Sequence, residues 1–318
     1  MQLTGFHHLT AVTADAPGNF QFYTRTLGLR LAKKSVNQDD VSAYHLFYTD
    51  GLASPGTDLT FFDWPVGRER RGARCVARTG LRVAGGESLG WWRDHLAAAG
   101  VRLGEIRQRD GRATLDFEDP EGQRLRLTAD DAPGEVHPWE KSPIPVRHQI
   151  CGLGPIFLSV PRLEPTELIL TRVMNLRRVR DYAWDGDGGG TAHVFQLGAA
   201  GLAGELHVVV QPDLAPARSG AGGVHHVAFR TPDETAYRAW ADRLREMGVP
   251  TSGPVDRFYF RSLYFREPNG VLFEIATDGP GFTADEPLET LGERLALPPF
   301  LEPRRAEIER GLKPLATR

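Results

Sequence analysis

The segment that decides the fold opens with Gly222-Gly223-Val224-His225-His226-Val227-Ala228-Phe229 and closes with Pro268-Asn269-Gly270-Val271-Leu272-Phe273-Glu274-Ile275. The first run predicts a β-strand, and the second predicts a turn followed by a strand. Each strand carries a side chain that can bind a metal, and a similar strand, Phe6-His7-His8-Leu9-Thr10, stands near the N-terminus. Two histidines and one glutamate would form a facial triad, which is typical of non-haem iron(II) with open coordination positions. Such a site requires a fold that brings these three strands together.

Four segments of the chain share one pattern, in which a strand and a helix are followed by three strands. The pattern predicts an α+β protein of four βαβββ modules, numbered one to four in chain order, at residues 5–64, 73–130, 152–213 and 223–278. Module four shows it most clearly. There Thr231 is the predicted N-cap of a helix that stops at Gly248, and two strands are predicted at 257–260 and 262–265 before the Glu274 strand.

The modules suggest how the chain is divided. We expect an N-terminal domain of modules one and two (residues 1–130) and a C-terminal domain of modules three and four (152–280). The segment 131–151 is rich in proline and charge, and it is predicted to link the two domains. Residues 281–318 are predicted to be an extension, with a short amphipathic helix around Arg304 to Leu312.

Composition sets broad limits on function. The 318 residues are 41% hydrophobic and 25% charged, which is typical of a soluble globular protein. The net charge of −3 gives no reason to expect a nucleic acid or an anionic membrane as a partner. The two cysteines are too few for a disulfide framework, and the sequence shows neither a signal peptide nor a membrane-spanning run. We therefore expect a cytoplasmic protein, whose reducing surroundings would suit a ferrous ion.

Strand geometry selects one histidine from each His-His pair, because adjacent side chains point to opposite faces of a sheet. In module four the bulky Val227 and Phe229 share a face with His225, whereas His226 shares the other face with small Ala228. If the bulky residues pack under the helix, His226 faces the concave side of the sheet. The same parity applies to the other two strands. The predicted metal ligands are His8, His226 and Glu274.

The other modules lack this ligand set. Residues 115–127 of module two match residues 263–275 of module four position by position, but Arg126 replaces Glu274 and Asp116 replaces Tyr264. A cation in place of the carboxylate argues against a second copy of the metal site. The first strand of module three contains no histidine. We therefore expect all ligands to come from modules one and four.

With these residues identified, the chain resembles the ring-cleaving dioxygenases of the vicinal oxygen chelate superfamily (glyoxalase, bleomycin resistance and extradiol dioxygenase proteins), and more closely their para-hydroquinone subgroup. The matching motifs are spread over the whole chain and are specific only jointly. They are Gly5-Phe6-His7-His8-Leu9-Thr10, Tyr44-His45-Leu46-Phe47-Tyr48, Ser54-Pro55-Gly56-Thr57, Gly223-Val224-His225-His226-Val227-Ala228-Phe229, Asp256-Arg257-Phe258-Tyr259-Phe260-Arg261-Ser262-Leu263-Tyr264 and Gly270-Val271-Leu272-Phe273-Glu274.

The resemblance implies two cupped half-barrels, with modules one and four paired around iron(II) held by His8, His226 and Glu274. Manganese(II) would accept the same ligands. It also implies insertion of dioxygen into the ring of a hydroquinone-like or catechol-like phenol. The family positions assign catalytic roles to His225, Tyr264 and His7, and substrate contacts to Arg257 and Thr10.

Each of these supporting residues also has a simpler interpretation. His7 and His225 are either proton carriers or histidines that orient a neighbouring strand. Tyr264 either bonds a bound phenol through its hydroxyl or is aromatic core. Arg257 either binds an anionic substrate or pairs with Asp256 at a hairpin. The six remaining histidines have no partner at ligand spacing and were interpreted as structural or surface residues, namely His45, His95, His137, His148, His193 and His207.

Two other functions compete with the dioxygenase. A glyoxalase I-type lyase would hold zinc or nickel and stabilise an enediolate, usually with four ligands in two symmetric pairs, and Arg126 leaves only three here. A non-catalytic small-molecule-binding protein of the same fold has no need of a complete triad. The exact substrate, the metal and the oligomeric state stay open at this point, including whether the chain forms a homo-oligomer.

Overall fold

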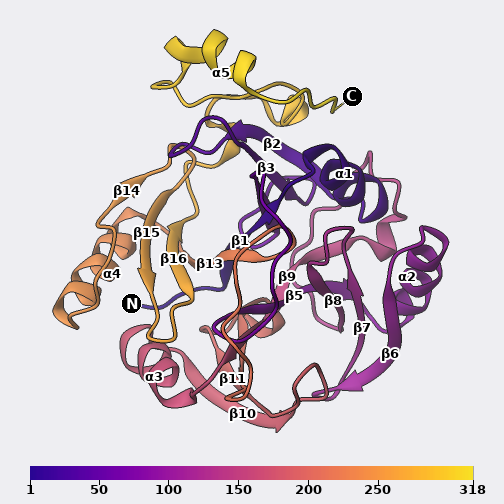
Figure 1. Cartoon of the computed structure of the whole chain (residues 1–318), viewed down its shortest axis with the longest axis vertical. Coiled ribbons are helices and arrows are strands. Elements are labelled where there is room, and N and C mark those ends of the chain that lie inside the picture. Colours follow the sequence, from indigo (N-terminus) through magenta and orange to yellow (C-terminus); the bar gives the residue numbers. More distant parts are fainter. Residues whose placement is uncertain (318) are drawn as a thin grey trace.

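Two eight-stranded sheets form the body of the molecule, which we describe for residues 1–317 from a computed structural model. Both sheets curl, and their helices lie on the outside (Figure 1). The predicted α+β fold of four βαβββ modules is confirmed. We call the sheet of modules one and four cup one, and the sheet of modules two and three cup two.

Cup one has the strand order β14-β15-β16-β13-β1-β4-β3-β2. Its centre is the antiparallel pair of β1 and β13, which joins module one to module four as the resemblance implied. The strands are β1 (Phe6–Thr13), β2 (Arg30–Val36), β3 (Tyr44–Thr49), β4 (Asp58–Asp63), β13 (Val224–Thr231), β14 (Val255–Asp256), β15 (Arg261–Arg266) and β16 (Leu272–Thr277).

Cup two has the order β10-β11-β12-β9-β5-β8-β7-β6, with β5 and β9 paired at its centre. Each cup therefore combines one module from before the segment 131–151 with one from after it. The expected division into an N-terminal and a C-terminal domain stays a prediction. The strands are β5 (Cys75–Ala84), β6 (Leu103–Arg109), β7 (Arg112–Glu118), β8 (Arg124–Asp130), β9 (Ile150–Val160), β10 (Arg177–Ala183), β11 (Thr191–Gln196) and β12 (Glu205–Val210).

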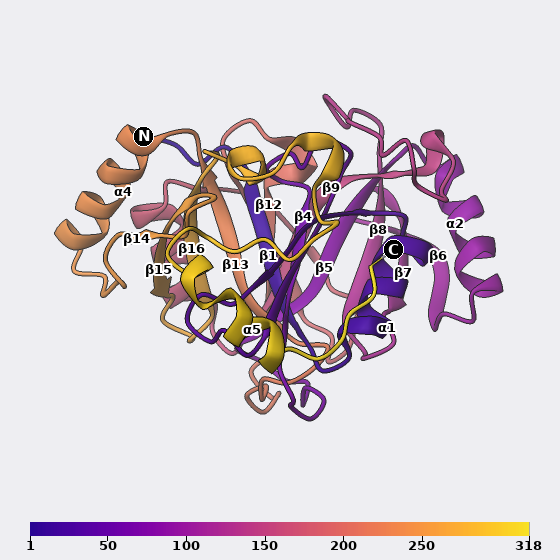
Figure 2. The same ribbon diagram turned by 90° about the horizontal axis from the view of Figure 1, so that it is seen from above.

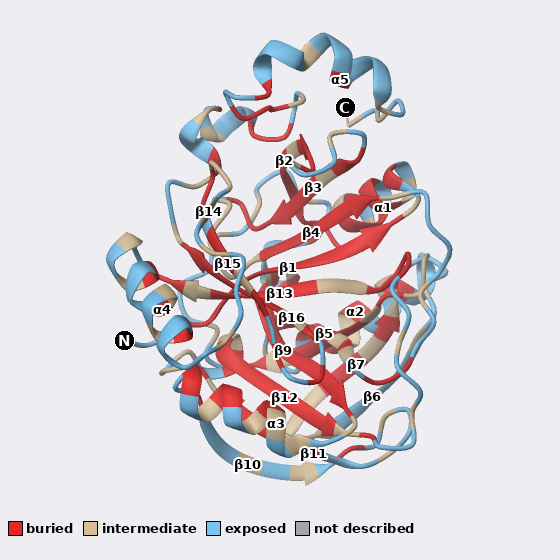
Figure 3. Ribbon diagram, turned by 60° about the vertical axis from the view of Figure 1, so that its left-hand side comes forward, coloured by how far each residue is buried: buried red, intermediate tan, exposed pale blue. Residues whose placement is uncertain are grey.

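One helix from each module covers the convex face of its sheet (Figures 1 and 2). They are α1 (Ala16–Gln21), α2 (Glu87–Ala98), α3 (Leu163–Leu168) and α4 (Glu234–Glu246). The fully buried Trp92 and Trp240 face the strands, while the outer helix surfaces are exposed (Figure 3). The predicted N-cap at Thr231 was wrong by two residues: Thr231 ends β13, and the side chain of Asp233 accepts the Ala236 amide at 2.8 Å.

The predicted strand at 257–260 was also wrong, because β14 ends at Asp256 and a tight turn follows. Asp256 accepts the backbone amide of Phe258 at 2.8 Å, and Phe258 has a φ of 70°. The aromatic side chains that suggested a strand are instead directed inward, and Tyr259 and Phe260 are buried in cup one. The turn therefore supplies a wall of the cup.

The C-terminal extension runs past β2 at the rim of cup one and ends with α5 (Arg305–Gly311), where a helix was predicted (Figure 1). Leu297, Leu301 and Ile308 pack with Val36 of β2. The extension is also held by Lys33 of β2, whose side chain is completely buried and contacts Asp285 at 2.7 Å and Glu286 at 2.5 Å. Module one therefore supports the extension through both apolar and charged contacts.

Candidate metal centre

Three neighbouring strands of cup one carry the predicted ligands: His8 on β1, His226 on β13 and Glu274 on β16. Ala228 of β13 is the register partner of both His8 and Glu274, and its small side chain leaves space between them. The alternate residues of these strands are core residues with no exposed surface, including Val227, Phe229, Phe273 and Ile275. Burial of the bulky face therefore turns the other face, with the three ligands, into the cup.

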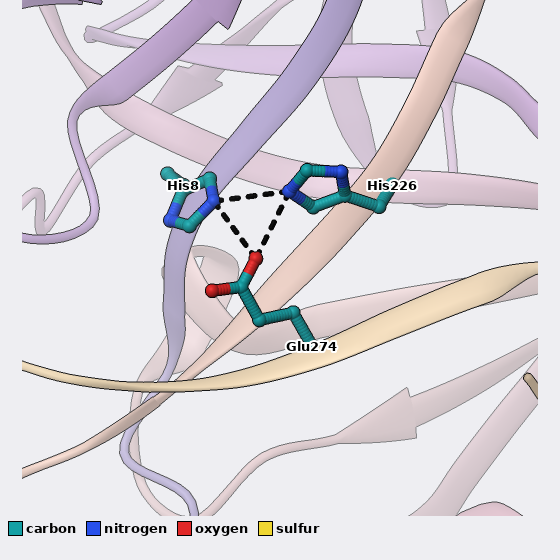
Figure 4. A group of neighbouring side chains, drawn as sticks. All are labelled: His8, His226 and Glu274. Atoms are coloured by element: carbon teal, nitrogen blue, oxygen red, sulfur yellow. Dashed lines mark hydrogen bonds and ion pairs between the residues drawn. The ribbon is translucent and has the colours of Figure 1, made fainter. Parts of the chain in front are cut away.

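The three donor atoms converge on one point (Figure 4). Oε2 of Glu274 lies 2.9 Å from Nε2 of His226 and 3.1 Å from Nε2 of His8, and the two Nε2 atoms are 3.2 Å apart. Ligands at 90° around an ion with bonds of ~2.1–2.2 Å lie about 3.0–3.1 Å apart, whereas tetrahedral ligands lie about 3.4 Å apart or more. The observed separations fit three adjacent positions of an octahedral ion.

Glu274 has the environment of a metal ligand. Its side chain is completely buried, and neither carboxylate oxygen accepts a hydrogen bond of acceptable geometry, although two imidazole nitrogens lie at ion-pair distance. A buried carboxylate without hydrogen bonds is costly unless a cation compensates it. Burial alone would raise the pKa of Glu274, but His8 and His226 outweigh that effect and hold the pKa well below its ordinary value. The residues present therefore fit a divalent ion.

His7 and His225 lie behind the ligands and do not line the cavity. Nδ1 of His7 is 2.9 Å from Nδ1 of His8, and Nδ1 of His225 is 2.7 Å from Nδ1 of His226. Burial and the neighbouring ligand histidine lower the pKa of each supporting histidine to about 3. A neutral imidazole in this position orients the ligand ring so that Nε2 faces the ion. This arrangement favours the orienting interpretation over proton transfer.

The structure places the other three predicted site residues beside the triad. Tyr264 is the register partner of Glu274, and Nε of Arg257 donates to the Tyr264 hydroxyl at 3.3 Å. Burial is the main cause that raises the pKa of Tyr264, with the Glu274 carboxylate adding to it, so this hydroxyl keeps its proton. Thr10 Oγ1 is 3.0 Å from Nε2 of His226. Arg257 pairs with Asp39 at 2.8 Å rather than with Asp256.

A cleft of about 480 Å³ opens onto the triad. Phe47, Phe62 and Phe260 give it aromatic walls. Its polar side is formed by Asn37, Gln38, Asp39, His45, Arg257 and Tyr264. The mixed lining suits a flat ring with polar substituents.

Sequence reasoning missed two residues of this cleft. His45 was interpreted as structural or surface, yet it lines the cleft and contacts Thr60 of β4 at 2.9 Å. Asp39 lies in the irregular segment between β2 and β3, which has no periodic pattern. For His45 there was one usable signal, since it shares a strand face with Phe47 in a period-2 pattern.

Cup two contains a second group of possible ligand types, Asp110, Glu205 and His207. Arg180 and Arg112 already neutralise it: Arg180 contacts both carboxylates, at 2.6 Å for Glu205, and Arg112 contacts Glu205 at 3.2 Å. These guanidinium groups supply the positive charge that an ion would bring. We assign this group to an ion-pair network rather than to a metal site.

Arg126 occupies the position in cup two that corresponds to Glu274. It is 1% exposed, its guanidinium lies 4.8 Å from the Phe157 ring centroid and 5.2 Å from that of Trp184, and it donates to Asp116 at 2.6 Å. The sequence predicted a cation in place of the carboxylate at this position. In the structure this cation and its partners fill the interior of cup two.

The family model described as Glyoxalase/Bleomycin resistance protein/Dioxygenase superfamily matches residues 5–127 and 152–275. The chain belongs to this superfamily. It is 47% identical over 317 residues to the Bacillus subtilis protein named "Putative ring-cleaving dioxygenase MhqA", which covers 99% of this chain and 100% of that protein. It is 32% identical to the chlorohydroquinone/hydroquinone 1,2-dioxygenase of Sphingobium indicum, over 98% of this chain and 96% of that enzyme.

Solved structures of the superfamily show the same fold. The crystal structure of a Bacillus subtilis "putative dioxygenase" superposes with a TM-score of 0.90 at 34% identity, over 100% of this chain and 99% of that chain. Glyoxalase I of Zea mays superposes with a TM-score of 0.62 at 14% identity, over 86% of this chain and 92% of that chain, which shows the fold alone. Within residues 1–317, no helix is both long and apolar enough to cross a membrane.

Proposed function

We propose that this protein is a ring-cleaving dioxygenase for a hydroquinone-like phenol, with iron(II) held by His8, His226 and Glu274. One observation carries the proposal: two imidazole nitrogens and a buried carboxylate without hydrogen bonds converge with octahedral spacing at the floor of an aromatic-walled cleft. The named activities of the relatives support it. Iron is proposed because this ligand set is typical of non-haem iron(II), and manganese(II) would fit the same three ligands. A cytoplasmic location stays our expectation.

The chain's own residues would bind and orient the phenol. When bound, the metal supplies Lewis-acid polarisation of a phenol oxygen and an adjacent position for dioxygen. Phe47, Phe62 and Phe260 would pack against the ring and exclude water. Arg257 and Tyr264 present N–H and O–H donors on the polar side, where negative charge would develop. His8, His226 and Glu274 would hold the metal and, being only three, would leave room beside it for the substrate.

Metal analysis combined with oxygen uptake tests the proposal. We expect anaerobically purified protein to hold one iron per chain and to consume oxygen with methylhydroquinone. Glu274→Ala should lose both properties. The matched control is Glu205→Gln, which alters a buried carboxylate beside a histidine in cup two and should keep the iron.

Three results would contradict the proposal. They are zinc or nickel with activity only on a hemithioacetal, iron retained by Glu274→Ala, and a wild-type protein that binds no metal. The first would assign the chain to the glyoxalase I-type lyases, and the last would remove metal chemistry altogether.

A further inference from the structure

A line of hydrogen bonds crosses the concave face of cup one from the cleft to the metal centre. Nε2 of His45 lies 2.9 Å from Oγ1 of Thr60, Thr60 donates to Oγ1 of Thr10 at 2.8 Å, and that atom lies 3.0 Å from Nε2 of His226. These residues belong to the four adjacent strands β3, β4, β1 and β13. The line therefore depends on the sheet itself and needs no flexible segment.

The middle of the line is dry. Thr10 and Thr60 have no exposed surface, so water does not complete their hydrogen bonds. Burial of two hydroxyl groups among apolar strands costs free energy unless each is bonded, and Thr60 is bonded on both sides. A hydroxyl both donates and accepts, and its hydrogen rotates to suit its partners. A pair of such groups can pass a proton in either direction.

The inner end of the line lies beside the metal position. Thr10 Oγ1 is 3.0 Å from Nε2 of His226, which is close to the spacing among the three ligand atoms themselves. A phenol oxygen bound next to these ligands would therefore be within hydrogen-bond reach of Thr10.

The outer end is the one imidazole of the cleft that is not a predicted ligand. Among residues 1–317, the histidines that line the cleft are His8, His45 and His226. His7 and His225 act on the ligands from behind through Nδ1, and Tyr264 keeps its proton. The other basic group of the cleft, Asp39, is paired with Arg257 at 2.8 Å, which leaves His45 to receive a proton.

We propose that His45 accepts the phenol proton of the bound substrate through Thr10 and Thr60; this rests on the proposed function. The phenol O–H bond breaks as its proton passes to Thr10, Thr10 passes its own proton to Thr60, and Thr60 passes its proton to Nε2 of His45. One O–H bond is replaced by one N–H bond, the electron pair stays on the phenol oxygen, and nothing is oxidised. After the transfer Thr60 donates to Thr10, and Nε2 of His45 donates to Thr60. Thr60 already donates to Thr10 in the substrate-free structure, so both hydroxyls rotate and the His45 proton moves to Nδ1 before the transfer starts.

The surroundings of His45 agree with this role. Burial is the main cause that holds its pKa well below the ordinary value, and His8, His226 and Arg257 act in the same direction, opposed by Glu274. His45 is therefore neutral before substrate binds, and its Nε2 offers a lone pair when the ring carries its proton on Nδ1. The negative charge of a bound phenolate would favour its protonated form.

The test follows the ionisation of nitrohydroquinone, whose absorbance reports loss of the phenol proton, on metal-loaded protein without oxygen. We expect His45→Gln and Thr60→Val to lower the ionisation constant of the bound probe about tenfold, or about 1.4 kcal/mol. Thr60→Ser keeps the hydroxyl and should restore the wild-type curve. The control is Thr128→Val, which removes a buried hydroxyl from β8 in cup two. β8 is the last strand of module two, as β4 is of module one. Oxygen uptake should show a fall in kcat of about 10²-fold for His45→Gln with little change in KM.

The outcomes separate this inference from the proposed function. Identical ionisation curves for the wild type, His45→Gln and Thr60→Val would overturn the proton path and leave the dioxygenase standing. A shift in Thr60→Val but not in His45→Gln would overturn His45 as the acceptor. If wild-type protein with one metal per chain failed to bind the probe, both conclusions would fall. Metal content is measured for every variant, so loss of the ion cannot imitate loss of the path.

Discussion

Each ligand histidine is held by the histidine that precedes it in the sequence. The Nδ1–Nδ1 contacts are 2.9 Å for His7 and His8 and 2.7 Å for His225 and His226, so one ring of each pair must donate and the other must accept. This fixes the tautomer of the ligand and directs Nε2 into the cup. Each His-His pair therefore consists of a predicted ligand and the histidine that orients it.

We predict that His225→Phe and His7→Phe weaken metal binding while Glu274 and both ligands remain. Loss of an outer hydrogen bond to a ligand typically costs 10- to 100-fold in affinity, so we expect a change of about that size in competition with a chromogenic chelator. His193→Phe is the control, because His193 lies in cup two beside Asp181. Unchanged affinity in both variants would show that the paired histidines do not position the ligands.

At the scale of single elements, the segment between β2 and β3 is joined to the turn after β14 across the cleft. Asp39 accepts two hydrogen bonds from Arg257, at 3.1 and 2.8 Å, and the Gln38 side chain donates to the Arg257 carbonyl at 2.8 Å. Arg257 also reaches Tyr264. The position of Arg257 in the cleft therefore depends on a segment more than two hundred positions away in the sequence.

Asp39→Asn should release Arg257 and weaken substrate binding with little effect on folding. Asp39 is 72% exposed, and such pairs contribute about 0.2–1 kcal/mol, which corresponds to a rise in KM of about 1.4- to 5-fold. Added salt should raise the wild-type KM and have less effect on the variant. Glu234→Gln is the control, since it breaks the exposed pair between Glu234 of α4 and Arg261 of β15. A KM identical to that of the wild type would mean that Asp39 does not position Arg257.

The sequence predicted those parts of the site that lie on regular strands. His8, His226 and Glu274 follow from strand parity, because one face of each strand is apolar and must be buried. The turn at 257–260 was misjudged because inward-facing aromatic residues resemble a strand. Asp39 was missed because it lies in an irregular segment that has no periodic pattern. Thr60, the partner of His45, was missed because it depends on the pairing of β3 with β4, which local periodicity does not contain.

At the scale of the whole molecule, two cups of the same fold have opposite interiors. Cup one keeps an open cleft and three ligands. Cup two is filled by ion pairs around Arg126, Glu205 and Arg180. The arginines of cup two fill the region that in cup one is left for the proposed ion and substrate, so we infer that one cup carries the chemistry and the other provides a rigid support.

The Glu205 network makes stability dependent on pH in the acid range. Burial would raise the pKa of Glu205, but His207, Arg180 and Arg112 outweigh it and lower the pKa from 4.5 to about 2. Since the folded pKa is the lower one, Glu205 stabilises the folded state above pH ~4.5, and this contribution is lost as the pH falls toward about 2. The shift corresponds to at most about 3 kcal/mol.

We therefore expect Glu205→Gln to lower the urea midpoint clearly at neutral pH, and to differ less and less from the wild type as the pH falls below about 4.5. Glu307→Gln, an exposed change on α5, should leave the midpoint unchanged at every pH. A Glu205→Gln deficit that stayed constant down to acid pH would contradict the role of its charge.

The C-terminal extension is joined to the site by one buried cation. Lys33 has no exposed surface, contacts Asp285 and Glu286, and lies 4.7 Å from the ring centroid of Tyr259, which lines the cleft. Tyr259 in turn donates to Asp285 at 2.8 Å. The extension, module one and the turn after β14 therefore share this network.

Lys33→Met would remove the buried cation shared by Asp285 and Glu286 and would leave Glu286 with Arg294 alone, at 3.4 Å. Breaking a buried pair from one side typically costs about 3–5 kcal/mol, and we expect a loss of that size in urea unfolding together with weaker binding of the nitrohydroquinone probe. The triple change Lys33→Met, Asp285→Asn and Glu286→Gln removes the stranded charges and should recover part of the stability. Lys313→Met is the control, because this lysine is 59% exposed and 3.9 Å from Asp63. If Lys33→Met unfolded at the wild-type midpoint, the buried ion pairs would add nothing to the stability of the extension. Its apolar contacts with Val36 and its hydrogen bonds to Lys34 and Tyr44 would then hold it.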